Sequence, residues 1–280
     1  MYDHPGGALY LVSTPIGNLK DITIRSLDVL AKVHFVASED TRVTRHLLDH
    51  YKIATPCVSY HEHNRNEKIP IFLHRMEKGE SIALVSDAGT PLISDPGSAL
   101  VLETIGRGLP VHPVPGPSSI LAALSASGLF EDQFFFGGFL PRGRGDLERF
   151  LRESASRSEA LVFFETPRRI VRTLGTMEEV LGADRHVSVA REMTKLHESF
   201  YRGRIPEVRD LLDSAPLLGE LVLVVEGAPP EKRFKEVSPS VLEALSHLAA
   251  SRADKARFLA KAFGLSRNTA YHLAGNDAPE

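Results

Sequence analysis

Three loops rich in glycine and proline each follow a short apolar run, and this arrangement limits the fold more than any other feature of the chain. The loops are residues 13–23, 86–97 and 114–119. Apolar runs such as residues 82–85 are typical of buried parallel strands, and the turn residues begin where those strands would end. Ligands of open α/β sheets bind at these carboxyl ends. The sequence therefore predicts that several strand ends converge on one ligand.

The length of the chain favours more than one core. A chain of 280 residues is near the upper size of a single hydrophobic core, so two α/β domains are favoured over one. Short apolar strands alternate with amphipathic stretches from residue 9 to about residue 113, as in a doubly wound sheet with helices on both faces. We expect a flexible N-terminus over residues 1–8, a doubly wound α/β domain over 9–117, a second α/β domain over 118–228, and a linker with a helical tail over 229–280.

Periodicity and turn signals place the individual elements. Strands are expected at residues 9–12, 35–37, 82–85, 133–136, 160–164, 186–190 and 220–225. Helices are expected at residues 24–31, 44–50, 119–127, 145–153, 168–177 and 205–212. We place the hinge between the domains after Pro117.

The tail is predicted to be helical and basic. Ser238 and Pro239 are typical of an N-cap followed by the first helical residue, and an apolar stripe follows. Two more helices are expected, at about 252–263 and 266–275, in a layout that resembles a helix-turn-helix. Their basic side chains, which can meet phosphate, are Arg252, Lys255, Arg257, Lys261 and Arg267. A solvated helical cap is the alternative.

The composition limits the cellular compartment and the kinds of partner that we expect for this protein. The single cysteine, Cys57, excludes an internal disulfide framework and fits a reducing compartment. No apolar stretch approaches the roughly 18 residues that cross a bilayer, and the start of the chain lacks the layout of a signal peptide. A cytoplasmic protein without membrane contact is expected. The net charge of −3 argues against coating nucleic acid by bulk charge, so any RNA contact must be local.

The loops do not match the standard phosphate-binding signatures. The chain has no GxxxxGK[ST] motif, and Pro15 removes an N–H donor that a pyrophosphate would use. The loops instead offer the carboxylates Asp21, Asp87 and Asp95. The small residues beside them are Gly89, Thr90, Gly97, Ser118 and Ser119. A cationic, amino-acid-like ligand such as a sulfonium or ammonium suits this set, since opposite charges attract at close range. Ordinary strand-to-helix turns are the alternative.

Six ordered motifs carry a resemblance to a known family. They are residues 11–23, 38–42, 86–97, 114–118, 164–168 and 190–195. Together they resemble the tetrapyrrole methylase superfamily, and within it the bacterial methyltransferases that act on ribose 2′-oxygens of small-subunit rRNA. The resemblance implies a homodimer of two-domain subunits with S-adenosylmethionine in the interdomain cleft. It also implies a cytidine ribose in the decoding region of 16S rRNA as the methyl acceptor.

The resemblance transfers cofactor contacts to matching positions. They are Pro15, Gly17, Ala88, Gly89, Thr90, Pro91, Ser118, Ser119, Phe164, Glu165, Thr194 and Val225. Asp87 is added as a cofactor residue because its carboxylate suits a cationic ligand. Relatives that act on tetrapyrroles usually carry a more glycine-rich first loop, and this difference favours RNA as the substrate. The chain departs from the family at residues 142–145, where arginines replace a lysine-containing linker.

A ribose hydroxyl is a poor nucleophile when neutral, so its methylation benefits from a base or a cation. Glu39, Asp40, Glu192 and Lys195 follow predicted strands, and we favour Asp40 and Lys195 as the catalytic pair. Asp40 could instead cap the next helix, and Lys195 could pair with Glu198.

Arginines near the same loops are candidates for contact with RNA phosphates. They are Arg42, Arg168 and Arg191, and surface ion pairing is the alternative. The His61 to Asn64 segment lacks a third metal ligand at helical spacing, so no metal site is predicted. Two rival functions remain open: the same fold acting on a tetrapyrrole or a protein side chain, and a non-catalytic RNA-binding protein.

Overall fold

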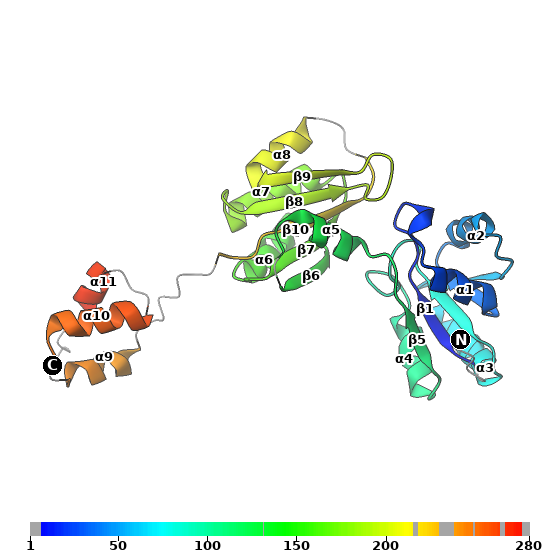
Figure 1. Ribbon diagram of the computed structural model, residues 1–280, viewed down its shortest axis with the longest axis horizontal. Helices are drawn as coiled ribbons and strands as arrows, with labels where there is room; N and C mark the ends of the chain where they lie inside the picture. Colours follow the sequence, from blue (N-terminus) through cyan, green and yellow to red (C-terminus); the bar gives the residue numbers. More distant parts are fainter. Residues whose placement is uncertain are drawn as a thin grey trace. The chain divides into compact units, whose positions relative to one another are not determined.

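The computed structural model describes residues 7–130, 132–214, 218–229, 238–248, 250–263 and 267–275. The chain divides into two compact units, residues 1–227 and 228–280. The first unit contains two lobes, each built on its own five-stranded sheet (Figure 1).

The first lobe is a parallel sheet with the strand order β3-β2-β4-β1-β5. Its strands are β1 (Leu9–Val12), β2 (Phe35–Ser38), β3 (Cys57–Ser59), β4 (Ile82–Val85) and β5 (Val111–Val114). Its helices are the 3-10 helix η1 (Leu19–Asp21), α1 (Ile24–Lys32), α2 (Thr41–His50), α3 (Arg65–Glu77) and α4 (Ser98–Gly106). The edge strand β3 was not predicted, whereas β5 corresponds to the apolar run expected before the loop at residues 114–119. β5 contains Pro113, which a sheet edge tolerates because an edge strand leaves half of its N–H groups unpaired.

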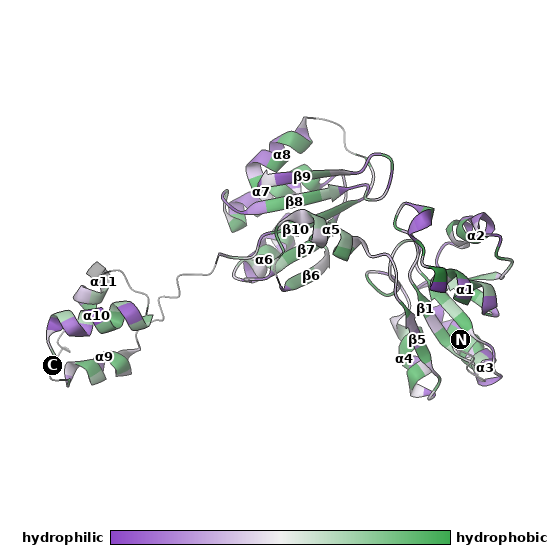
Figure 2. Ribbon diagram, in the orientation of Figure 1, coloured by the Kyte–Doolittle hydropathy of each residue, from purple (hydrophilic) through white to green (hydrophobic). Residues whose placement is uncertain are grey.

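Both faces of the first sheet are covered. On one face, Leu30 of α1 and Leu47 of α2 pack against Val36 and Val85. On the other face, α3 and α4 contribute a second core that includes Phe72. The strands are accordingly apolar along their lengths (Figure 2). The doubly wound α/β arrangement predicted for this part of the chain is confirmed.

The second lobe is a mixed sheet with the strand order β6-β7-β10-β8-β9. Its strands are β6 (Phe134–Phe139), β7 (Ala160–Glu165), β8 (His186–Arg191), β9 (Ser199–Arg204) and β10 (Leu221–Val225). Its helices are α5 (Ser119–Ser127), α6 (Arg144–Ser154), α7 (Ile170–Leu181) and α8 (Ile205–Asp213). Only β6 and β7 are parallel neighbours, and the other pairs are antiparallel. β9 was not predicted, because its sequence SFYRGR is too polar for the apolar-run criterion.

The two lobes share a core. Helices α6, α7 and α8 cover one face of the second sheet. Helix α5 covers the other face through Ile120, Ala123 and Leu124, and Ile16 from the first loop of the first lobe joins this cluster. The hinge predicted after Pro117 falls between β5 and α5, where the Ser118 hydroxyl caps α5 by accepting a hydrogen bond from the Leu121 N–H.

The N-terminal segment is only partly described. Residues 1–6 of the predicted flexible N-terminus lie outside the described residues. Gly7 and Ala8 are buried, and Ala8 belongs to a core cluster of the first lobe. The flexible segment therefore does not extend to these two residues, because Ala8 and the first residue of β1, Leu9, already pack into the core of the first lobe.

The second unit is a small helical body made of α9 (Pro239–Ser246), α10 (Arg252–Phe263) and α11 (Arg267–Leu273). Ala256, Leu259 and Ala270 form its buried centre. Leu242 and Leu245 of the predicted apolar stripe pack against that centre, whereas Leu248 is 56% exposed. Leu248 falls outside the packed stripe because α9 ends at Ser246.

Candidate functional site

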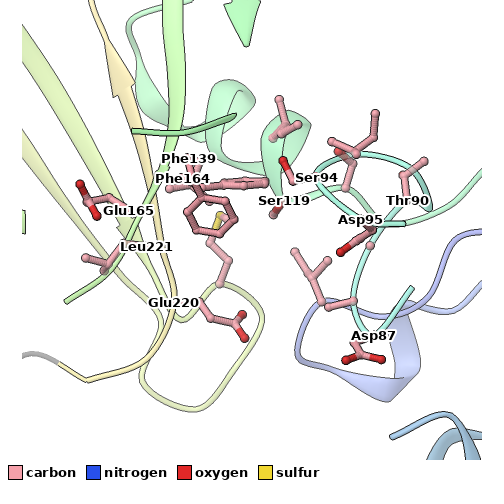
Figure 3. Close-up of a pocket in the computed structure, with 18 of the residues that line it drawn as sticks. Asp87, Thr90, Ser94, Asp95, Ser119, Phe139, Phe164, Glu165, Glu220 and Leu221 are labelled. Atoms are coloured by element: carbon pink, nitrogen blue, oxygen red, sulfur yellow. The ribbon is translucent and has the colours of Figure 1, made fainter. Parts of the chain in front are cut away.

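A cavity of about 360 Å³ lies where the predicted loops meet in the first unit (Figure 3). Ile16 enters from the loop after β1, residues 87–90 and 93–95 from the loop after β4, and Ser118 and Ser119 from the loop after β5. The second lobe supplies the opposite wall. Eight of the residues predicted to contact the cofactor line this cavity: Asp87, Ala88, Gly89, Thr90, Ser118, Ser119, Phe164 and Glu165.

Hydrogen bonds hold the three loops together. The backbones of Thr14 and Gly89 exchange two hydrogen bonds, of 2.9 and 3.0 Å. The Thr90 hydroxyl donates to the Pro117 carbonyl over 3.2 Å, and the Ser13 hydroxyl donates to Thr90. Gly89 has a φ of +84°, a conformation that favours glycine. The cavity wall on this side is therefore set by backbone contacts between loops distant in sequence.

The second lobe gives the cavity an apolar wall. The rings of Phe139 and Phe164 lie 5.3 Å apart between centroids, and Met193 and Leu221 lie beside them. Sequence reasoning singled out Phe164 but not the others. Phe139 lies three residues beyond the strand expected at residues 133–136, and Met193 and Leu221 lie next to ordinary core positions. Their role becomes visible only when the two lobes are brought together.

Two carboxylates of the first lobe line the cavity opposite this wall: Asp95 points toward the phenylalanine rings, and Asp87 lies below it with its carboxylate turned away from them (Figure 3). Burial raises the pKa of Asp95 to about 6, and the neighbouring carboxylates Glu39 and Asp87 add to the shift. Asp87 accepts a hydrogen bond of 3.2 Å from the Asp40 backbone N–H. Within the described parts of the chain, neither Asp87 nor Asp95 forms an ion pair. The arrangement therefore leaves negative charge in the cavity without a protein cation, which suits a positively charged ligand.

Glu165 has a structural role in addition to its place on the cavity wall. Its fully buried carboxylate accepts hydrogen bonds from the Thr166 N–H and the Thr173 hydroxyl, each 2.7 Å long, and lies 3.2 Å from Arg169. These contacts direct the carboxylate away from the centre of the cavity (Figure 3). Glu165 thereby ties the end of β7 to α7.

Several predicted cofactor residues lie elsewhere. Pro15 and Gly17 line a second, smaller cavity of about 110 Å³, which shares Asp87 with the first. Pro91 is buried next to the loop after β4 and does not line either cavity. Val225 is fully buried in the core of the second lobe. The residues of β10 that reach the main cavity are Leu221 and Val222, at the other end of that strand.

Gly17 brings the first loop against the loop between β8 and β9. A Cβ atom at Gly17 would lie 2.5 Å from Lys195 Cγ, 2.8 Å from Thr194 Oγ1 and 2.9 Å from the Met193 carbonyl oxygen. The Thr194 hydroxyl is buried there without a hydrogen-bond partner among the described residues. Only glycine permits this close approach between the lobes.

Asp40 is used as a helix cap. Its carboxylate accepts hydrogen bonds from the Arg42 backbone N–H (2.9 Å) and from the Arg42 guanidinium, with an ion pair of 2.6 Å. The Arg42 side chain and backbone lower the pKa of Asp40 to about 2. Asp40 does not line either cavity. The capping alternative raised from the sequence thus describes its contacts, and this geometry favours a structural role over that of a base.

Lys195 belongs to an ion network at the rim of the main cavity. Its Nζ lies 2.9 Å from Glu192 Oε1 and 3.4 Å from Glu220 Oε2. Burial acts to lower the pKa of Lys195, but the hydrogen bonds and charges of the two glutamates outweigh it and the net shift is upward. Glu198, the partner considered from the sequence, instead accepts a hydrogen bond from the Thr194 N–H over 2.6 Å. Lys195 therefore stays a cation next to a cavity residue.

The candidate RNA contacts differ in exposure. In the first unit, the Arg42 side chain is 89% exposed, Arg168 is exposed next to the cavity residue Pro167, and Arg191 donates to the Leu218 carbonyl over 2.8 Å.

In the second unit, Arg257 is 78% exposed, Lys261 is exposed, and Lys255 donates to the Ser246 carbonyl. Arg267 begins α11, but its side chain lies outside the described residues. Arg252 joins α10 to α11 by donating to the Tyr271 carbonyl over 3.0 Å. On α10, Arg252 thus contacts α11, whereas Arg257 and Lys261 face solvent, with Arg257 paired to Asp254.

No group of three His, Cys, Asp or Glu side chains within the described residues is placed to hold a metal ion. In the same part of the chain, every helix is too short or too polar to cross a membrane.

Comparison with known proteins identifies similar chains. The family model for tetrapyrrole (corrin/porphyrin) methylases matches residues 8–209. The ribosomal RNA small subunit methyltransferase I of Haemophilus influenzae is 42% identical over 271 residues, which cover 95% of this chain and 96% of that protein. The protein of the same name from Thermotoga maritima is 44% identical over 221 residues, covering 79% of this chain and 99% of that protein. A uroporphyrin-III C-methyltransferase from Thermus thermophilus, solved with S-adenosyl homocysteine, has a similar fold, with a TM-score of 0.55 and 20% identity over 79% of this chain and 97% of that one.

Proposed function

Because this chain belongs to the tetrapyrrole methylase family, and within it to the ribosomal RNA small subunit methyltransferases I, we propose that it transfers a methyl group from S-adenosylmethionine to a ribose of 16S rRNA. The acceptor that we propose is the 2′-oxygen of a cytidine in the decoding region. The observation that carries the proposal is the main cavity, which joins three loops of the first lobe to an aromatic wall of the second.

The residues of the cavity suit each part of S-adenosylmethionine. Phe139 and Phe164 offer flat apolar surfaces for an adenine ring. Asp87 supplies negative charge for a sulfonium or an ammonium group. Ser118, at the start of α5, offers a hydroxyl beside a helix N-terminus, where a carboxylate is favoured.

The proposed reaction depends mainly on how the methyl acceptor is positioned. Bound S-adenosylmethionine supplies an already activated methyl group. Holding the acceptor in line with that group can lower the barrier by up to about 7 to 11 kcal/mol. Ile93, Phe139 and Met193 give the cavity an apolar lining, and the cationic Lys195 at its rim can stabilise negative charge developing on the ribose oxygen.

The RNA contacts follow from charge and exposure. We propose that Arg42, Arg168 and Arg191 face phosphates near the cavity. In the second unit, we assign the same role to Lys255, Arg257, Lys261 and Arg267. The partner would be the small ribosomal subunit, which places the protein in the cytoplasm.

We also propose that the protein forms a homodimer. The exposed side chains of Leu102 and Ile105 on α4 are consistent with a surface that a second copy covers, and light scattering measures the mass of the particle in solution.

A labelling experiment tests the reaction and the acceptor together. The purified protein is incubated with radiolabelled S-adenosylmethionine and unmodified small ribosomal subunits, and the RNA is digested for mass spectrometry. A 2′-O-methylated cytidine is expected. Label in another nucleoside or at another position would refute the proposed acceptor. Calorimetric binding of S-adenosylmethionine without label in RNA would redirect the search to tetrapyrrole or protein acceptors, and the absence of binding would favour a non-catalytic RNA-binding protein.

A further inference from the structure

The carboxylates around the main cavity differ in their availability to take up a proton. Asp40 is held by Arg42 outside the cavity. Glu165 is held by two hydrogen bonds and by Arg169. Glu220 pairs with Lys195. In each case a cation or a set of donors stabilises the ionised form and so weakens the group as a base.

Asp95 lies in the cavity without such a partner. It follows Ser94, which has a φ of +65°, and precedes the turn at Gly97, with a φ of +140°. This loop directs the Asp95 carboxylate into the cavity above Asp87 (Figure 3). Within the described residues, no lysine, arginine or histidine forms an ion pair with it.

The groups that face Asp95 favour its protonated form. Glu39 from the end of β2 and Asp87 from the loop after β4 repel its negative charge, while the Ser86 hydroxyl partly opposes them. Glu220 faces the same cavity from the second lobe. Burial together with these carboxylates brings the pKa of Asp95 to about 6, within the range in which a general base works at neutral pH. Asp40, with its pKa near 2, lies far outside that range.

We propose that Asp95 is the general base of the methyl transfer. This inference rests on the proposed function. The ribose 2′-oxygen forms a bond to the methyl carbon while the carbon–sulfur bond breaks, and the electron pair of that bond goes to sulfur, which becomes a neutral thioether. The hydroxyl proton passes to the Asp95 carboxylate. Charge is balanced, because the cationic donor and the anionic carboxylate both become neutral.

The test compares Asp95→Asn with the wild type in single-turnover methyl transfer to small ribosomal subunits at saturating S-adenosylmethionine. A loss of about 100-fold or more is expected, since a positioned base contributes roughly 10²- to 10⁴-fold. Asp95→Glu, which keeps the carboxylate, is expected to restore part of the rate. Asp28→Asn, a change on the exposed face of α1, is the matched control and should leave the rate unchanged.

Binding measurements distinguish a general base from a side chain that only attracts the cationic cofactor. Calorimetry with S-adenosylmethionine and with the uncharged thioether S-adenosylhomocysteine should give affinities of Asp95→Asn within about threefold of the wild type for both. A selective loss of S-adenosylmethionine affinity, with the rate at saturation retained, would show that Asp95 only attracts the sulfonium and would overturn the proposal.

The pH dependence gives an independent readout. For the wild type, kcat/KM reports the free enzyme and should fall on the acid side with a midpoint near pH 6, and Asp95→Asn should lack this fall. An Asp95→Asn rate within tenfold of the wild type, or an equal loss in Asp40→Asn, would overturn the assignment of the base alone. Absence of transfer by the wild type would overturn the proposed function together with it.

Discussion

At the scale of single residues, Asp40 and Asp95 show how the environment separates two carboxylates at the same edge of a sheet. Asp40 gains hydrogen bonds and a charge partner from Arg42, and its pKa falls to about 2. Asp95 loses solvent and gains like charges, and its pKa rises to about 6. Such divergence between neighbouring titratable groups is a recurring property of active sites. It also makes the two residues respond in opposite ways when the pH changes.

The first prediction concerns the stability of Asp95→Asn. The pKa of Asp95 is raised on folding from 3.8 to about 6, so the folded state binds the proton more tightly and stability is lost as the pH rises through 6. Allowing for partial exposure, Asp95→Asn should increase the free energy of unfolding at pH 8 by about 1 to 2 kcal/mol. Near pH 4 the gain should largely disappear. Urea unfolding at the two pH values measures this, and an equal effect at both would contradict the shifted pKa.

The second prediction concerns Gly17→Ala. The added Cβ would lie 2.9 Å from the backbone oxygen of Met193 and closer still to the side chains of Thr194 and Lys195. Forcing the loops apart should cost about 1 to 3 kcal/mol in the free energy of unfolding. Gly175→Ala in α7 is the matched control: a Cβ there meets open space, so stability should rise by up to about 1 kcal/mol. Thermal unfolding of both variants distinguishes close approach from a general effect of removing glycine.

At the scale of elements, the sequence predicted the central strands and most helices of both lobes, because their apolar runs are long and their caps are clear. Helix α10 has the predicted bounds, and α8 differs by one residue. The edge strands β3 and β9 were missed, because strands at an edge bury little surface and show a weak apolar pattern. Their pairing is decided by neighbours distant in sequence.

The site was predictable to the extent that it follows strand ends. The loops after β4 and β5 carry turn residues and polar side chains that sequence reasoning detects. The far wall of the cavity was not predictable in this way, because Phe139 and Leu221 resemble core positions until the lobes are placed together. The partner of Lys195 was likewise missed, because Glu192 and Glu220 reach it through a loop with Glu192 at a φ of +50°.

The third prediction concerns that loop between β8 and β9. Lys195→Met removes the partner of Glu192, whose carboxylate is 19% exposed and also accepts the Glu220 N–H. The free energy of unfolding should fall by about 1 kcal/mol, and the loop should become more sensitive to limited proteolysis. Lys68→Met on α3 is the control, because its partner Glu67 is 67% exposed and such pairs contribute little. Equal proteolysis rates in the two variants would contradict the role of Lys195 in holding the loop.

At the scale of the whole molecule, the catalytic unit and the helical unit are separable in both structure and sequence. The family model ends at residue 209, and the compact first unit ends at Gly227. The Thermotoga maritima relative matches 79% of this chain along 99% of its own length, so it has no counterpart for a part about as long as the second unit. The cavity is formed entirely by residues of the first unit. Cofactor binding and RNA affinity should therefore respond differently when the second unit is removed.

The fourth prediction follows from that separation. A chain ending at Gly227 should unfold cooperatively and bind S-adenosylmethionine within about threefold of the full chain, since every residue of the cavity remains. Its KM for small ribosomal subunits should rise by about tenfold or more, because phosphate contacts supply much of the affinity for RNA.

In the full chain, Arg257→Gln with Lys261→Gln should reproduce part of this loss and reduce the salt dependence of binding by about one to two ions, since each phosphate contact releases roughly one counterion. The matched control is Arg45→Gln with Arg75→Gln, two arginines of the first unit that pair with Asp49 and Glu80. If the truncated chain kept the full affinity and the full salt dependence, the helical unit would be a solvated cap, and the RNA contacts would have to lie on the arginines around the cavity.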